Sequence, residues 1–273
     1  MPGPASKTLR HRLEAWLLGA GALPLFAFLV LPLVALLLKV TPAVLVRAFG
    51  ESATVQAVGL SLSTSAATLV VVVVLGTPLA HLLARRQFRG RTIVEALIDL
   101  PTVLPPAVAG VALLLAFGRR SLVSQWLEHC GVQIAWSPVA VVLAQTFVAA
   151  PYYIKSASVG LAGVSKDLLE AAALDGASPR QAFFHVSLPL AWRGIASGAA
   201  LCWSRALGEF GATIIFAGNY PGRTQTMPLA VYIGFEIDLD QALALAAVML
   251  LVSFGVLLLI RATTRRQSGD LAP

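Results

Sequence analysis

The chain has 273 residues, of which 58% are hydrophobic and only 12% are charged, and its mean hydropathy is +0.81. A water-soluble domain carries roughly 25% charged residues, so this composition excludes an ordinary soluble protein. The net charge of +7 is not gathered into a basic patch with interleaved aromatic residues, which argues against a nucleic-acid partner. The long apolar runs lack the alternation of a β-barrel and predict an all-α polytopic protein in a lipid bilayer.

Six apolar segments between the charged residues predict membrane spans, because about 20 helical residues cross a hydrocarbon core of ~30 Å. In chain order they lie at residues 16–38, within 54–80, at 100–117, within 138–154, at 194–216 and at 242–260. The first is too long for the core of a signal peptide, so we expect it to be retained. The third contains Pro101, Pro105 and Pro106, and we expect it to be kinked or partly unwound.

Lysine and arginine assign the two sides of the membrane. The terminal segments and the segments that follow the second and fourth spans hold 14 of these residues, the other connecting segments hold 5, and Arg205 lies inside the fifth span. The positive-inside rule therefore predicts cytoplasmic N and C termini. The predicted organisation is a cytoplasmic segment at 1–14, one six-helix domain at 15–261 with a cytoplasmic loop at 155–194, and a cytoplasmic tail at 262–273.

Several chemistries find no support in the sequence. The two cysteines and four histidines lack metal-ligand spacing, so we expect no metal site. None of the four lysines follows a glycine, as a P-loop requires, and no G-x-S-x-G or H-E-x-x-H pattern occurs. We therefore expect the chain not to be an enzyme, and to draw energy from a partner or from an ion gradient.

The loop at 155–194 carries helix signals. Ser165 is a candidate N-cap for a helix over 166–174, which Gly176 would end. Residues 178–181, Ser-Pro-Arg-Gln, form the start of a capping box for a second short helix, expected to end near Leu188-Pro189. This pattern predicts a helix–turn–helix unit that projects from the membrane and offers its alanines to another surface, with a merely connecting loop as the alternative.

The same unit resembles a known motif. Glu170-Ala171-Ala172, Gly176 four residues on, and Leu188-Pro189 further along are similar to the EAA motif of bacterial ABC importer permeases. The resemblance implies the type I ABC importer permease fold, and a first helix that docks in a groove on a cytoplasmic ATPase. It also implies a dimer of ATPase subunits that bind ATP and Mg, no cofactor in this chain, and a second copy of this chain.

Other segments resemble the molybdate, tungstate and sulfate branch of these permeases. They are residues 60–62, 76–86 and 100–106, and the most diagnostic runs, 208–213 and 218–230, are most similar to molybdate permeases. Residues 119–121 and 136–137, both in an outer loop, depart from the usual pattern. The resemblance implies a bacterial inner-membrane permease that receives molybdate from an extracytoplasmic binding protein. Tungstate or sulfate/thiosulfate import is the alternative, and a secondary transporter is a more distant one, since no internal repeat is visible.

Arg205 and Glu209 are the predicted charged site. Arg205 lies eleven residues beyond Gly194, about 16 Å into a core of ~30 Å, where a charge usually faces a polar path or a partner. Glu209, at i+4, can pair with it. Either the two side chains neutralise each other or cap nearby backbone, or the arginine helps an oxyanion to pass while Glu209 partly neutralises it.

Three further predictions concern the path and its surroundings. Thr213, Pro105 and Pro106 complete the predicted substrate path and gate. The polar segment at 218–241 is predicted to be the surface on which a binding protein docks, with a plain solvated loop as the alternative. Gly194-x-x-x-Gly198 is expected to let two helices pack closely.

Overall fold

The computed structural model describes residues 4–119, 121 and 134–269, and every regular element in this part of the chain is a helix. The helices in chain order are α1 Pro4–Lys39, α2 Pro42–Gly50, α3 Ser52–Arg85, α4 Arg91–Val103, α5 Pro106–Phe117, α7 Pro138–Ala162, α8 Lys166–Leu174, α9 Pro179–Ala182, the π-helix η1 Phe183–Ser187, α10 Leu188–Leu190, α11 Trp192–Leu207, α12 Gly211–Phe216, α13 Met227–Ile237 and α14 Leu239–Gly269. The all-α prediction is confirmed for these residues.

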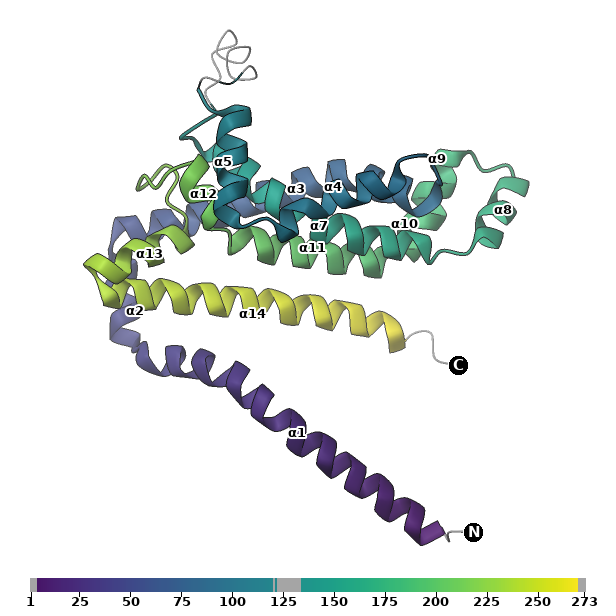
Figure 1. Cartoon of the computed structure of the whole chain (residues 1–273), viewed down its shortest axis with the longest axis horizontal. Coiled ribbons are helices and arrows are strands. Elements are labelled where there is room, and N and C mark those ends of the chain that lie inside the picture. Colours follow the sequence, from purple (N-terminus) through teal and green to yellow (C-terminus); the bar gives the residue numbers. More distant parts are fainter. Residues whose placement is uncertain (1–3, 120, 122–133, 270–273) are drawn as a thin grey trace.

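Four helical segments of the described chain are long and apolar enough to cross a membrane. They are Gly21–Lys39, Ser52–Arg85, Pro138–Ala162 and Leu239–Leu258. A fifth span arises if α4 and α5 are counted together, although they are bent by 116° at the break between them. The break follows Val103 and coincides with the prolines, as expected for the third span, and Figure 1 shows α5 running crosswise to α4.

One predicted span is not a single helix. Residues 194–216 are divided between α11, which ends at Leu207, and the short α12. Glycine at 208 weakens the helix locally, and the backbone of Phe210 turns out of it at φ −128° and ψ −57°. The prediction of one continuous helix here is wrong. The buried side chain of Glu209 stabilises the break, because it accepts a hydrogen bond from the Ala212 N–H in the first turn of α12.

The core of the bundle is a layer of α3, α7 and α11, with α14 alongside (Figure 1). The α7 and α11 backbones touch: a Cβ built on Gly194 would lie 2.7 Å from the Cα of Gly160, and one on Gly198 would lie 3.0 Å from the carbonyl oxygen of Tyr153. The Ser156 hydroxyl also donates to the Gly194 carbonyl at 2.8 Å. The expectation that the 194/198 glycine pair serves packing is confirmed.

The buried face of α3 is unusually polar. Its buried positions recur at helical spacing and are Thr54, Ala57, Ser61, Thr64, Ser65, Thr68, Val72, Gly76, Ala80 and Leu83. Gln145 of α7 joins this face, since Thr68 donates to its Oε1 at 3.0 Å and its Nε2 donates to Thr64 at 3.3 Å. Small and hydroxyl-bearing residues suit helix contacts in lipid, where association has no hydrophobic driving force.

The segment at 218–241 is not the polar loop that was predicted. Its apolar residues form α13, which begins at Met227 after Thr226 and whose first N–H donates to the Ser61 hydroxyl at 2.7 Å. Thr224 and Gln225 are buried, whereas Arg223 stays exposed. Glu236 and Asp240 also stay exposed, so docking of a binding protein on this segment stays a prediction.

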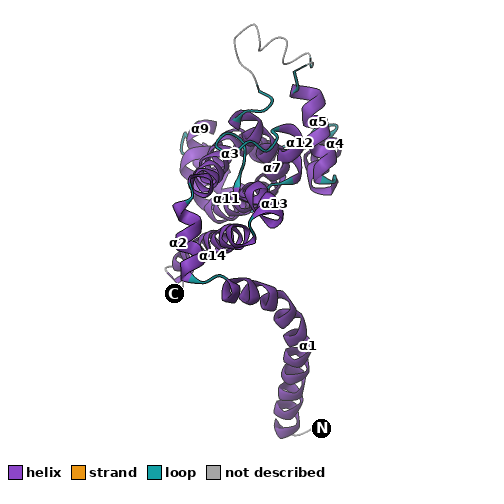
Figure 2. Ribbon diagram, turned by 90° about the vertical axis from the view of Figure 1, so that its left-hand side faces the viewer, coloured by secondary structure: helices purple, strands orange, loops and turns teal. Residues whose placement is uncertain are grey.

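Helix α1 leaves the bundle, as Figures 1 and 2 show from two directions. None of the residues in its apolar window, 21–39, is buried, and Phe28 and Leu31 are among its exposed side chains. An apolar helix of this length needs lipid or another protein surface around it.

Candidate coupling and transport sites

The predicted coupling unit begins with a well-formed α8. The Ser165 hydroxyl accepts the Asp167 N–H at 3.2 Å, as an N-cap does. At the other end Gly176 takes φ +87°, and the N–H groups of Gly176 and Ala177 donate to the carbonyls of Ala173 and Ala172. This is a Schellman ending, which needs a residue that tolerates positive φ. The predicted helix and its glycine stop are confirmed.

The second helix of the unit continues further than expected. Ser178 and Gln181 form the predicted capping box, but the helix passes from α9 through η1 and α10 up to α11. The prediction that Leu188-Pro189 ends it is wrong. Proline supplies no N–H, and the wider turn of η1, in which the Leu188 N–H donates to the Phe183 carbonyl, accommodates the missing donor.

The surface of α8 is open, since none of its residues is buried. Glu170 and Ala171 are exposed and Ala172 is half-buried. Apolar side chains stand beside them: Leu168 is 50% exposed and Leu174 is 90% exposed. Exposed leucines next to small residues on a projecting helix are typical of a surface that a partner covers.

The unit is nevertheless fastened to the bundle. Leu169, Phe183 and Leu188 pack against the buried cluster formed by α3, α7 and α11. Arg85, at the end of α3, donates to the Val164 carbonyl at 3.0 Å, just before the N-cap of α8. These contacts connect α8 to the ends of α3 and α7.

Arg205 and Glu209 form the ion pair that their spacing predicts, with Nη1 and Oε2 2.7 Å apart. The Glu209 side chain is only 1% exposed and Arg205 is 28% exposed. The second carboxylate oxygen of Glu209 accepts the Ala212 N–H at 2.8 Å. Glu209 thus bridges the last turn of α11 and the first turn of α12, and it compensates for the break between them.

The proline break of α4 and α5 meets this second break. A Cβ on Gly211 would lie 2.5 Å from Cβ of Pro106, and one on Gly110 would lie 2.9 Å from the carbonyl oxygen of Ala212. The structure therefore brings Pro106 close to the Glu209 bridge. Pro105 is exposed and Thr213 is fully buried, so the threonine does not line an open path in this conformation.

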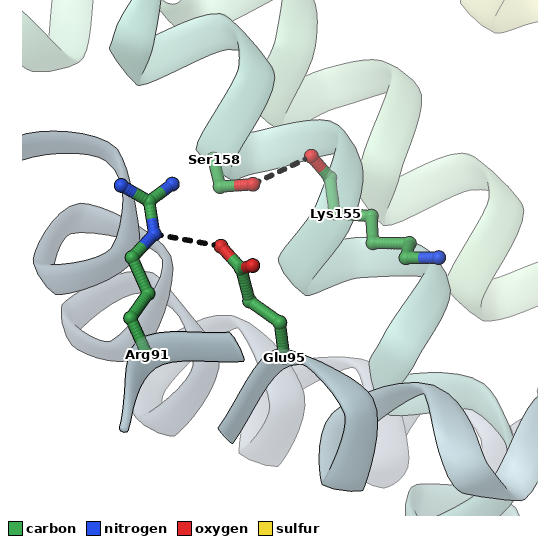
Figure 3. A network of polar contacts seen from close by, with 4 residues as sticks. All are labelled: Arg91, Glu95, Lys155 and Ser158. Atoms are coloured by element: carbon green, nitrogen blue, oxygen red, sulfur yellow. Dashed lines mark hydrogen bonds and ion pairs between the residues drawn. The ribbon is translucent and has the colours of Figure 1, made fainter. Parts of the chain in front are cut away.

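Polar contacts that the sequence analysis did not single out lie where α4 packs on α7, and Figure 3 shows Arg91 and Glu95 of α4 with Lys155 and Ser158 of α7. Lys155 Nζ lies 2.9 Å from Asp99 Oδ1, and Arg91 Nε lies 2.8 Å from Glu95 Oε1. The Ser158 hydroxyl donates to the Lys155 carbonyl at 2.9 Å. These side chains border a cavity of about 400 Å³ between the two helices. Because Lys155 is 61% exposed, its ion pair with Asp99 stabilises the fold by at most about 1 kcal/mol. The two residues lie 56 positions apart in the chain, so no local sequence pattern pairs them.

The arrangement of helices is shared with an ABC transporter. A chain in the crystal structure of a bacterial ABC transporter involved in the import of the acidic polysaccharide alginate superposes with a TM-score of 0.75, over 95% of this chain and 99% of that chain. The two sequences are 18% identical, so the likeness defines the fold alone.

Sequence relatives define the family. The molybdenum transport system permease protein ModB of Mycobacterium tuberculosis is 42% identical over 87% of this chain and 90% of its own length. The molybdate/tungstate transport system permease protein WtpB of Thermococcus kodakarensis is 32% identical over 96% of this chain and 100% of its own length. Residues 73–268 match the family described as binding-protein-dependent transport system inner membrane component. The chain belongs to that family.

Proposed function

We propose that this chain is the membrane-spanning permease subunit of an ATP-driven importer of molybdate. The observation that carries the proposal is the 42% identity to a molybdenum permease over most of both chains. The open α8 with Glu170-Ala171-Ala172 supports it, because it provides the kind of surface through which a separate ATPase can act. The chain itself is a conduit and not an enzyme.

The α8 end of the bundle is assigned to the cytoplasm. Most lysines and arginines fall in segments at this end, which is the side the positive-inside rule selects, and in Figure 1 the C-terminal end of α14 lies on the same side as α8. This assignment gives six passages with α4 and α5 together as the third and α11 and α12 together as the fifth. A cytoplasmic ATPase dimer then meets α8, and ATP and Mg are bound there and not in this chain. The membrane is the bacterial inner membrane.

Coupling follows the contacts already described. Movement of the ATPase shifts α8, and Leu169 and Phe183 pass that shift to the core of α3, α7 and α11. Helix α11 leads directly to the Glu209 bridge, where Pro106 of α5 rests on Gly211. The two adjacent helix breaks are the natural place for a gate, because a break can change its angle without unwinding a whole span. Arg205, at the edge of this region, supplies a positive charge to a passing oxyanion.

A second copy of this chain completes the pathway. Helix α1 has an apolar surface that its own bundle leaves uncovered. A partner copy beside the bundle would cover part of this surface and would place two sets of helix breaks around one path. Lipid covers the remainder.

The substrate reaches the permease from an extracytoplasmic binding protein, in keeping with the family's description as binding-protein-dependent. Molybdate is favoured over tungstate because the relative with 42% identity is a molybdenum permease, whereas the molybdate/tungstate relative shares 32%. Tungstate and sulfate remain the competing substrates, since all three are tetrahedral dianions of similar size.

The test is transport by the reconstituted complex. The chain would be purified with its ATPase and binding protein and placed in liposomes, and uptake of molybdate, tungstate and sulfate would be measured with and without ATP. We expect ATP-dependent uptake in which molybdate dominates, and its loss when Ala172→Glu is introduced in α8. Arg180→Gln, which changes an exposed side chain of the same unit, is the matched control. Uptake that runs on an ion gradient without the ATPase would overturn the proposal.

A further inference from the structure

A groove with two arginines lies at the end of the bundle opposite α8. It has a volume of about 470 Å³ and is lined by Arg119, Ala135, Trp136, Tyr220, Pro221 and Arg223. Trp136 precedes the first turn of α7, and α8 follows its last turn. The 25 residues of α7 therefore separate the groove from the coupling unit by about 37 Å. Under the orientation proposed above, the groove opens to the outside.

The turn that carries Arg223 is held in one conformation. The carbonyl of Tyr220 accepts the N–H groups of Arg223, Thr224 and Gln225 at 2.9–3.0 Å, and the Tyr220 N–H donates to the Thr224 hydroxyl at 3.0 Å. Thr224 is fully buried, and Gly222 takes φ +71° to close the turn. The backbone that carries Arg223 is thus fixed, so binding of an anion at its guanidinium orders the side chain alone and not the turn.

Another lining residue of the groove, Trp136, has a strained backbone. Trp136 has φ +62°, which is the one positive φ among the non-glycine residues that the structure describes. Its ring meets Tyr220 edge-on at 6.1 Å, and a Cβ on Gly218 would lie 2.8 Å from it. A bulky residue in this backbone region is costly and persists where the surroundings impose it, often at ligand sites.

The positive charges in the groove favour the binding of an anion. Arg119 follows α5 and Arg223 precedes α13, so two segments far apart in the chain each bring an arginine to the lining of one groove. No carboxylate is found among the lining residues that the structure describes. Two like charges at one site repel each other unless an anion lies between them, and guanidinium groups match tetrahedral oxyanions through paired N–H donors.

We propose that Arg119 and Arg223, walled by Trp136 and Tyr220, form an outer receiving site for the tetrahedral dianion that the importer carries. The inference rests on the proposed function and adds a substrate site to it. We expect the site to bind the oxyanion weakly, because a transport pathway must release the ion that it takes up. Helix α5 links the site to the gate region, since Arg119 lies two residues beyond its last turn and Pro106, at its start, contacts Gly211.

A carboxylate of the binding protein is the competing occupant. The volume of about 470 Å³ and the two arginines in the lining favour the free oxyanion, because a small dianion fits in the groove and carries two charges for two cations. An acidic side chain of a docked protein brings one charge and must enter beside two aromatic rings.

Two measurements on the full transporter in liposomes separate these occupants. The first is modification of arginine by phenylglyoxal, mapped by mass spectrometry, with molybdate or with sodium chloride of equal ionic strength. Molybdate should protect Arg119 and Arg223 and leave Arg89, an exposed arginine beyond the end of α3, unprotected. Equal modification with and without molybdate would overturn the proposal.

The second measurement compares transport with docking. In Arg119→Gln/Arg223→Gln, ATP-dependent uptake at saturating loaded binding protein should fall about tenfold or more, as expected for the loss of charge-assisted hydrogen bonds. The Kd for docking of the binding protein should change less than about twofold, and Arg119→Lys/Arg223→Lys, which keeps both charges, should retain more uptake than the glutamine pair. Arg89→Gln is the control, and size-exclusion elution checks the assembly of each variant.

A docking Kd that rises in step with the loss of uptake would identify a protein contact and overturn the oxyanion site. Unchanged uptake in the glutamine pair would overturn it as well. Absence of ATP-dependent uptake by the unmodified transporter would instead refute the proposed function.

Discussion

The contact between Gly160 and Gly194 offers the sharpest test of how α7 and α11 pack. In Gly194→Ala, the new Cβ would stand 2.7 Å from the Gly160 Cα and 2.9 Å from the carbonyl oxygen of Ser156. Both neighbours are backbone atoms, so no side chain can rotate to make room. The two helices must separate by several tenths of an ångström.

The size of the effect follows from two opposing contributions. Forcing an extra methyl into a packed interface costs about 1–3 kcal/mol, while alanine gains about 0.5–1 kcal/mol over glycine in a helix. A net destabilisation of up to about 2.5 kcal/mol remains. Gly59→Ala is the matched control, because no atom lies within 4 Å of its added Cβ on α3, and it should be stabilising by the helix contribution alone.

The assay is thermal unfolding of the purified chain in detergent, followed by tryptophan fluorescence and by loss of the monodisperse elution peak. Gly194→Ala should lower the transition temperature, and Gly59→Ala should hold or raise it. If both variants raised the transition temperature equally, the close contact of α7 and α11 would be incorrect.

Three other outcomes are expected. Arg205→Gln should destabilise the chain more than Arg205→Gln/Glu209→Gln does in the same thermal assay, because the single change leaves a buried carboxylate without its ion-pair partner; an equal or smaller loss in the single variant would contradict the pairing. Gly211→Ala should lower uptake with the ATPase still bound, since its Cβ would meet Pro106 at 2.5 Å, and normal uptake would argue against a gate at the two breaks. Leu174→Ser should weaken binding of the ATPase in a pull-down without changing the transition temperature, because this side chain is 90% exposed; unchanged binding would remove α8 from the interface.

Local sequence signals predicted the coupling unit well. Ser165, Gly176 and the Ser178–Gln181 box act through hydrogen bonds that span two to five residues, so the information needed to place them is contained in the adjacent sequence. The i+4 pairing of Arg205 and Glu209 is local in the same sense. Whether these residues bind the ATPase or the oxyanion stays a prediction.

Errors arose where distant contacts outweigh local preference. Pro189 ends many helices, yet here a π-helical turn packed on the bundle lets the helix continue. Residues 218–241 read as a polar loop, but α3 provides partners such as Ser61 that draw α13 into the bundle. The apolar run over 227–237 and Pro228 in its first turn are local helix signals, but no local rule predicts the packing on Ser61, which lies 166 residues away.

The sequence by itself determined the membrane class, most of the apolar helices and the helix–turn–helix unit, because hydropathy and capping operate over one helix at a time. Only the tertiary structure decided where Glu209 bridges a broken helix, that this bridge meets Pro106 and Gly211, and that Arg119 and Arg223 share one groove. Each of these depends on which backbones approach closely, and in a helical membrane protein that choice is made by small residues and buried hydrogen bonds between segments far apart in the chain.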